Sequence, residues 1–187
     1  MIALPSGFSP QEYLELEHKS NIRHEYRQGL VYAMAGGSDD HSRLAINFLT
    51  AVNLHLRNSP CCFLGGDVKV NYADQFFYYP DAFVTCDPRD QQNRYVKQFP
   101  KLILEVLSPA TENFDRTEKF QDYQRIATFE EYVLISQTQR EVEVRRRSPQ
   151  DWTGQIYRDR DDLNLTSIHL EISVSELYRG TSLEDFA

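Results

Sequence analysis

Three residues of this sequence have the types and spacing that metal-assisted hydrolysis of a phosphodiester requires. Such a reaction needs hard oxygen ligands for a cation, an oriented water molecule, and positive charge near the phosphate. Asp81 follows an aromatic run, Glu105 interrupts the apolar run 102–107, and Lys119 lies in the segment downstream. The two carboxylates could hold the cation, and the lysine could supply the positive charge.

Glu105 is the most informative of the three. A carboxylate in a central strand is costly unless it is paired, hydrogen-bonded or bound to a metal. Two ordinary explanations stay open for this residue alone: a strand at a sheet edge with Glu105 in solvent, or a structural ion pair. Asp81 says little by itself, because a polar residue is expected where a strand ends.

Lys119 shares one stripe of a predicted helix with Asp115 and Tyr123, because the three residues recur at four-residue steps. Taken in isolation, this spacing favours an ordinary pair between Asp115 and Lys119 on the helix surface. A catalytic role for Lys119 therefore requires that the helix bring it to the carboxylates.

Capping and periodicity signals predict the elements that position these residues. Ser9, Pro10 and Glu12 have the form of a capping box that begins a short helix, ending near His18. Apolar residues recur at three- and four-residue steps from 40 to 57, as in a helix that faces a core. Branched and aromatic runs predict the strands. The predicted strands are 24–27, 30–35, 61–64, 68–72, 76–84, 102–107, 132–135, 141–147 and 153–157, and the later helices are 115–126 and a short one that begins at Ser173.

This pattern predicts an α/β fold in which helices flank a mixed central sheet. The length of 187 residues predicts a single domain that spans positions 1–187. No apolar run approaches the roughly 20 residues that a membrane-spanning helix requires. The first residues lack the pattern of a secretory signal, which predicts a cytoplasmic protein.

The cysteines are predicted to be free. Cys61 and Cys62 are adjacent, Cys86 stands alone, and no zinc-binding spacing is present. An odd number of cysteines makes a poor disulfide framework, so all three are expected to be small buried apolar residues.

The charge balance argues against a broad nucleic-acid-binding surface. The formal net charge is -8, whereas non-specific binding to nucleic acid depends on a basic surface. Carboxylates gathered at a metal site would contribute to this total, and a bound cation would change the local field. The basic run 145–147 is interpreted as a strand end in solvent rather than as a phosphate-binding patch.

Several motifs together resemble a known family. They are the segments 79–81, 100–111, 115–120 with Tyr123, and 130–135, and the resemblance extends upstream to 23–29, 34–36 and His41. These segments resemble the Uma-type family of restriction endonucleases, which is placed in the PD-(D/E)XK nuclease superfamily. The resemblance covers nearly the whole chain and implies a restriction-endonuclease-like fold.

The resemblance implies specific roles for individual residues. Asp81 and Glu105 would bind Mg²⁺ or Mn²⁺, with the Val106 carbonyl as a third ligand and Glu25 completing the site directly or through water. The simplest superfamily motif, Glu-x-Lys, would place its lysine where this chain has Leu107. The Uma-type family shows the same departure and supplies the amine from the following helix, at the position of Lys119.

Three further positions qualify the resemblance. Gln28-Gly29 stands where many relatives have Asp-Gly, which affects the turn, and the segment 111–113 is less basic than in part of the family, which implies weaker phosphate contact. For His41, a capping or core-facing role at the start of the long helix is favoured over a catalytic one.

Three functions follow as hypotheses. The first is a Mg²⁺-dependent endonuclease that acts on DNA, as a homodimer because cutting both strands of a duplex normally calls for two active sites. The second is a non-catalytic nuclease-fold module that acts through protein association, which the acidic composition supports. The third is another paired-carboxylate hydrolase such as a glycosidase, in which Lys119 would have no evident task. The sequence does not identify the DNA sequence recognised or the strandedness of the substrate.

Overall fold

The computed structural model describes residues 7–184, which fold into helices and strands around buried apolar clusters. The α-helices are α1 (Pro10–Lys19), α2 (Asp39–Leu56), α3 (Glu112–Phe114), α4 (Phe120–Tyr123) and α5 (Val174–Leu177). The strands are β1 (His24–Arg27), β2 (Leu30–Ala33), β3 (Cys62–Gly65), β4 (Lys69–Tyr72), β5 (Phe76–Tyr78), β6 (Ala82–Thr85), β7 (Val96–Lys97), β8 (Pro100–Leu107), β9 (Glu131–Ser136), β10 (Glu141–Arg147), β11 (Trp152–Arg158), β12 (Asp162–Leu165) and β13 (Leu170–Ser173).

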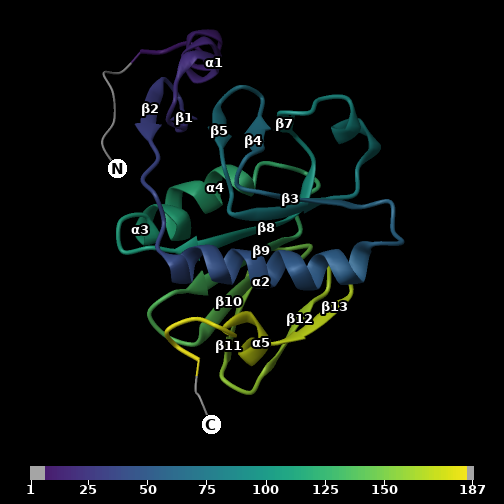
Figure 1. Ribbon diagram of the computed structural model, residues 1–187. Coiled ribbons are helices and arrows are strands. Elements are labelled where there is room, and N and C mark those ends of the chain that lie inside the picture. The colour runs from purple at the N-terminus through teal and green to yellow at the C-terminus, as the bar shows by residue number, and fades with distance from the viewer. Residues whose placement is uncertain (1–6, 185–187) are drawn as a thin grey trace.

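The larger sheet is mixed, as the sequence predicts. Its strand order is β11-β10-β9-β8-β6-β3; β8 and β9 run parallel, whereas the other neighbours are antiparallel. Helix α2 crosses one face of this sheet, with α5 and the β12–β13 hairpin beside it (Figure 1). The strand β8 therefore lies inside the sheet, covered on both faces.

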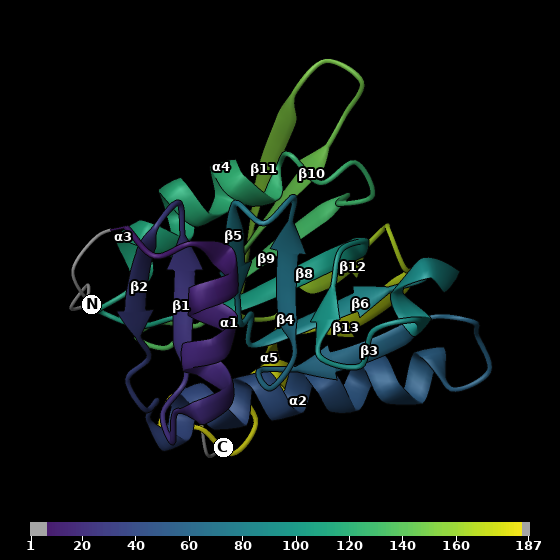
Figure 2. The same cartoon turned by 90° about the horizontal axis from the view of Figure 1, so that it is seen from above.

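A second sheet and the α3–α4 helical segment lie on the opposite face. This sheet has the order β2-β1-β5-β4-β7. Its Phe76 and Tyr78 pack with Ile103 of β8 and with Tyr123 of α4 in one buried cluster. Helix α1 lies over β1 on the far side of the second sheet, where Tyr13 stacks on Tyr26 (Figure 2). The interior between the two sheets is thus largely aromatic.

The N-terminal helix and the long helix confirm their sequence signals. The Ser9 side chain accepts a hydrogen bond from the Glu12 N–H, and the Glu12 carboxylate accepts one from the Ser9 N–H, which completes the predicted capping box. Helix α2 buries Leu44, Phe48 and Val52 against the larger sheet, as their spacing predicts.

The prediction of one continuous strand over 76–84 is wrong. The segment divides into β5 and β6, which belong to different sheets. Pro80 stands at the division, and proline has no N–H to donate to a strand neighbour. Asp81 therefore occupies the point where the chain leaves the second sheet and enters the larger one.

The helical segment that carries Lys119 differs from the predicted helix over 115–126. It begins at Glu112, ends at Tyr123 and contains a π-helical turn at Asp115–Lys119. Such turns widen the helix locally and occur often at functional sites.

The prediction of three free, buried cysteines is also wrong. Cys61 and Cys86 form a disulfide, and Cys62 is free and exposed. The register explains the pairing. Cys62 lies opposite Thr85 in the antiparallel β3–β6 pair, so Cys61, just before β3, faces Cys86, just after β6. This pairing between distant segments leaves no signal in cysteine spacing.

The arginine run at the end of β10 is only in part the solvated strand end that the sequence suggests, because Arg147 is exposed whereas Arg145 and Arg146 are partly buried. Arg145 contacts Glu143 at 2.6 Å, Arg146 contacts Glu131 at 2.8 Å, and Arg147 donates to the carbonyl oxygen of Ile126 at 3.0 Å. Each of the three arginine side chains therefore has a partner within the chain. Among residues 7–184, no helix is long and apolar enough to cross a membrane.

Candidate active site

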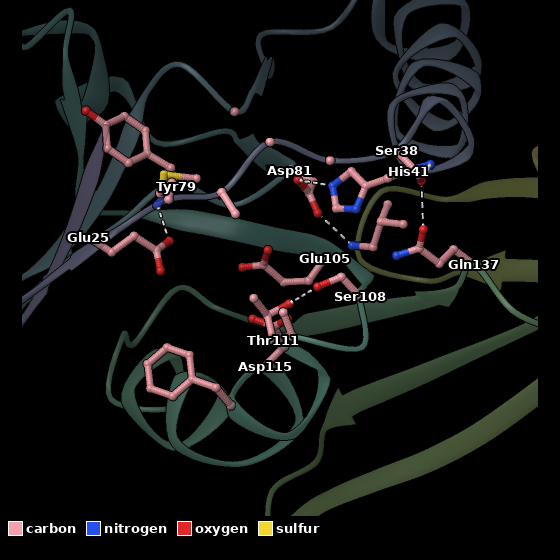
Figure 3. A pocket seen from close by; sticks show the side chains of 18 of the residues that line it. Glu25, Ser38, His41, Tyr79, Asp81, Glu105, Ser108, Thr111, Asp115 and Gln137 are labelled. Carbon is pink, nitrogen blue, oxygen red and sulfur yellow. Dashed lines mark hydrogen bonds and ion pairs between the residues drawn. The ribbon is translucent and has the colours of Figure 1, made fainter. Parts of the chain in front are cut away.

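The predicted site residues line one cavity of about 580 Å³. Glu25 comes from β1 of the second sheet, Asp81 precedes β6, Glu105 lies in β8, and Lys119 ends the π-helical turn. The carboxylates of Glu25, Asp81 and Glu105 surround a common space in Figure 3. The cavity therefore lies where the two sheets and the helical segment meet.

Asp81 is fixed by the end of the β6–β8 ladder. Ala82 pairs with Leu104, and beyond it the Asp81 side chain takes over as partner of β8: its Oδ2 accepts a hydrogen bond from the Val106 N–H at 2.7 Å. Its Oδ1 lies 2.9 Å from Nε2 of His41. Both carboxylate oxygens of Asp81 are thus held in place at the edge of the cavity.

Glu105 is neither in solvent nor on an edge strand. It is 3% exposed, and β8 has neighbours on both sides. Its Oε1 lies 3.0 Å from Nζ of Lys119 and accepts a hydrogen bond from the Tyr123 hydroxyl at 3.1 Å. Burial raises the pKa of Glu105 well above its usual value, although the Lys119 charge acts in the opposite direction.

Lys119 is buried, so the surface-pair interpretation is wrong. Its Nζ lies 3.1 Å from Oε1 of Glu25 and 3.4 Å from Oδ1 of Asp115, in addition to its contact with Glu105. Burial alone lowers the pKa of this ammonium, but Glu105, Glu25 and Asp115 together raise the pKa well above its usual value. Lys119 therefore remains a cation at neutral pH.

Carboxyl groups outnumber cations in the cluster around Lys119. Glu25, Glu105 and Asp115 supply three carboxyl groups to one ammonium, and Glu25 also accepts a hydrogen bond from the Tyr79 N–H at 2.9 Å. Burial raises the pKa of Glu25, with Lys119 partly offsetting it. Uncompensated buried charge is costly. A divalent cation beside these groups would favour their ionised forms and offset the cost of burying them.

The donor atoms of the cavity suit a hard cation such as Mg²⁺. Mg²⁺ favours oxygen ligands and is commonly held by one or two carboxylates together with water. Asp81 and Glu105 supply two carboxylates. The Val106 N–H points toward Asp81, and the carbonyl of a strand residue points to the same side as its own N–H, so the Val106 carbonyl also faces Asp81. Within residues 7–184, no group of three or more His, Cys, Asp or Glu side chains is arranged to hold one ion. The fit is therefore to a site with two carboxylates.

His41 has a different role from the capping or core-facing one that the sequence favours. The Ser38 side chain caps α2 by accepting from the His41 N–H, whereas the imidazole lies on Asp81. The hydrogen bond with Asp81 raises the pKa of His41. A Cβ on Gly37 would lie 3.0 Å from this ring, so glycine leaves room for it.

Sequence reasoning missed two contacts at this site, that of His41 with Asp81 and that of the Tyr123 hydroxyl with Glu105. The Asp115–Lys119 pair that the spacing favours is present, but it is buried. For Tyr123, the available signal is its four-residue spacing from Lys119. For His41, the signal was its inclusion in the family resemblance.

Comparisons with known proteins agree with the resemblance in the motifs. Residues 10–175 match the Uma2 family, described as "Putative restriction endonuclease". An uncharacterised protein of Synechocystis sp. is 38% identical over 174 residues, which cover 92% of each chain. A second uncharacterised protein of the same organism is 30% identical over 140 residues, which cover 73% of this chain and 79% of that protein.

A solved structure shares the fold. It is a crystal structure of "a putative nuclease belonging to DUF820" from Anabaena variabilis, with a TM-score of 0.77 and 16% identity, covering 92% of this chain and 98% of the other. At this identity the similarity concerns the fold, which confirms the predicted nuclease-like α/β architecture. With the family match over most of its length, the chain belongs to the Uma2 family of restriction endonuclease-like proteins.

Proposed function

We propose that this protein is a Mg²⁺-dependent endonuclease that hydrolyses phosphodiester bonds in DNA at the cavity between the two sheets. The observation that carries the proposal is the buried contact of Lys119 with Glu105 and Glu25, next to Asp81. Such a cluster brings together cation ligands and a permanent positive charge. The family membership and the shared fold support the same chemistry.

Each residue has a task in this proposal. Asp81 and Glu105 would hold the cation, which when bound supplies charge neutralisation and a more acidic water. Lys119 acts as an electrostatic group rather than as a base, because neighbouring carboxylates keep it protonated. Glu25 holds the Lys119 ammonium from the opposite sheet, and His41 holds the Asp81 carboxylate. A glycosidase site would leave Lys119 without such a task.

A cleavage assay tests this proposal. Labelled DNA, both duplex and single-stranded, is incubated with the protein in Mg²⁺, in Mn²⁺ and in EDTA. We expect fragments only with the metals, and none with the Asp81→Asn variant. If neither DNA is cut with either metal, the endonuclease proposal fails and the non-catalytic nuclease-fold module becomes the better account.

Divalent metal is expected to raise the melting temperature. A ligand that binds only the folded state stabilises it by mass action, and here it also relieves carboxylate repulsion. Thermal unfolding is followed with increasing Mg²⁺ or Mn²⁺ in the wild type and in Asp81→Asn, which should lose most of the shift. Asp162→Asn, an exposed position outside the cavity, is the matched control and should keep it. Equal shifts in the wild type and Asp81→Asn would place the ion elsewhere.

His41→Ala is expected to weaken metal binding by about 10- to 100-fold, as is typical when a group that orients a metal ligand is lost. The measurement is the Mg²⁺ concentration that gives half of the thermal shift and half of the maximal cleavage rate. His41→Gln retains an N–H donor and should recover part of the affinity. His18→Ala, exposed on α1, serves as control. Unchanged metal affinity in His41→Ala would leave the His41–Asp81 contact without a functional role.

A further inference from the structure

The groups that would act on a phosphate lie at the bottom of the cavity. Glu105 is 3% and Lys119 is 5% exposed, whereas the side chains of Asp81 and His41 at the edge are 23% and 20% exposed. For Lys119 to contact a phosphate oxygen, the phosphate must approach to about 3 Å, which is hydrogen-bonding distance. The scissile phosphate must therefore pass below the outer surface of the cavity to reach Lys119.

The cavity has the dimensions of a small-molecule site. Its volume of about 580 Å³ lies within the range of pockets that enclose one drug-sized ligand, and one nucleotide is of that size. On the side of α2, Gln137 closes the wall: it accepts a hydrogen bond from the Ser38 hydroxyl and donates one to the Leu107 carbonyl, each at 2.8 Å. Figure 3 shows Ser38 and Gln137 joined across this side. On this side the cavity is therefore closed by a hydrogen-bonded contact between the start of α2 and the segment that follows β9.

The lining of the cavity suits an unstacked nucleotide. Met34, Pro109 and Ala110 provide apolar surface, and the half-buried ring of Phe114 lines the same space. Unpaired bases stack on such aromatic rings with little dependence on sequence. A base that is already unpaired enters a pocket of this kind at a lower cost than one that must be extruded from a duplex.

The charge distribution points the same way. Duplex DNA carries about one negative charge per 1.7 Å of axis, about twice the density of one strand, and this chain has a net charge of -8. Near the cavity, Arg23 and Lys69 lie over the ring of Tyr79, at 5.8 and 4.9 Å from its centre. Arg23 is already paired with Asp67 and donates to the Gly66 carbonyl, which leaves Lys69 to meet a phosphate of one strand beside the cavity.

We propose that the substrate is single-stranded DNA, or an unpaired segment within DNA, and that one nucleotide of the strand enters the cavity so that its phosphate reaches Lys119. This inference rests on the proposed nuclease function. It also removes the requirement for two active sites, because a single strand is cut once.

The test compares one labelled oligonucleotide alone with the same oligonucleotide annealed to its complement, in Mg²⁺. The single strand should be cut at least tenfold faster, and a duplex with a central unpaired gap should be cut within the gap. Cleavage of the intact duplex interior at an equal or higher rate would overturn the inference while leaving the nuclease function intact.

Binding decides the inference independently of cleavage. With Ca²⁺ in place of Mg²⁺, fluorescence anisotropy should show at least tenfold tighter binding of the single strand than of the duplex; equal or weaker binding of the single strand would contradict the inference. A strand preference without cleavage would support the inference and count against the nuclease function.

Phe114→Leu should weaken single-strand binding about tenfold through lost stacking, whereas Tyr95→Leu, at an exposed ring outside the cavity, should not. Unchanged binding in Phe114→Leu would remove the stacking part of the inference.

Discussion

Lys119→Ala should lower metal-dependent DNA cleavage by about 10²- to 10³-fold, the loss typical of one preorganised electrostatic donor. Within residues 7–184, the ammonium is the one cation that contacts Glu25, Glu105 and Asp115, so no neighbouring group replaces it. Lys119→Arg should recover little activity, because a planar guanidinium does not fit where a compact ammonium contacts three carboxylates. Initial cleavage rates with saturating Mg²⁺ provide the measurement.

The same variant should lose stability. Removing one partner of a buried ion cluster typically costs about 3–5 kcal/mol, so cleavage is measured at a temperature at which circular dichroism shows the variant folded. Added Mg²⁺ should restore part of the lost stability, because the cation replaces the missing positive charge. Lys19→Ala, exposed on α1, should change neither quantity. If folded Lys119→Ala cuts DNA as fast as the wild type, Lys119 has no part in the mechanism.

Glu105→Gln should act in opposite directions on activity and stability. Cleavage should fall by more than about 10²-fold, beyond the loss expected for a residue that only orients a ligand. The melting temperature without metal should rise, since the amide carries no buried negative charge and Lys119 keeps Glu25 and Asp115 as partners. Gains of stability at the expense of function are common at active sites.

The stability difference should depend on pH. Burial raises the pKa of Glu105 in the folded protein. Its contribution to stability is therefore fully present below the unfolded pKa, about 4.5, and is lost as pH rises through the folded pKa. Glutamine resembles the protonated acid at every pH, so the advantage of Glu105→Gln should grow from pH 5 to pH 8. Glu171→Gln, exposed on β13, should show no such growth. A variant less stable than the wild type at pH 8 would show that Glu105 is a net stabilising ion pair.

Local signals in the sequence predicted much of the fold. The capping box at Ser9, the helical periodicity of α2 and the apolar run of β8 each depend on neighbouring residues, and the structure confirms all three elements. The interruption of that run by Glu105 indicated an unusual carboxylate, although an edge strand with Glu105 in solvent stayed open until the structure showed it buried. These features are visible because their physical cause lies within one or two turns or one strand of the residue itself.

Features that depend on distant pairing were not predictable in this way. The division at Pro80 depends on the pairing of β5 and β6 with strands of two different sheets. The disulfide depends on the register of β3 and β6. Spacing alone placed Lys119 on a helix surface, because burial of its stripe depends on the second sheet that supplies Glu25. Only the family resemblance brought Glu25 into the predicted site.

The most direct test of the proposed metal site is a crystal structure of the protein soaked in Mn²⁺, with the ion located by anomalous scattering. The proposal predicts an ion in the cavity, bound by the carboxylates of Asp81 and Glu105 at about 2.0–2.2 Å, close to the distances of Mg²⁺ sites. Crystals of Asp81→Asn should lack this peak. Anomalous density elsewhere on the wild-type protein, with none between Asp81 and Glu105 at millimolar Mn²⁺, would contradict the proposal.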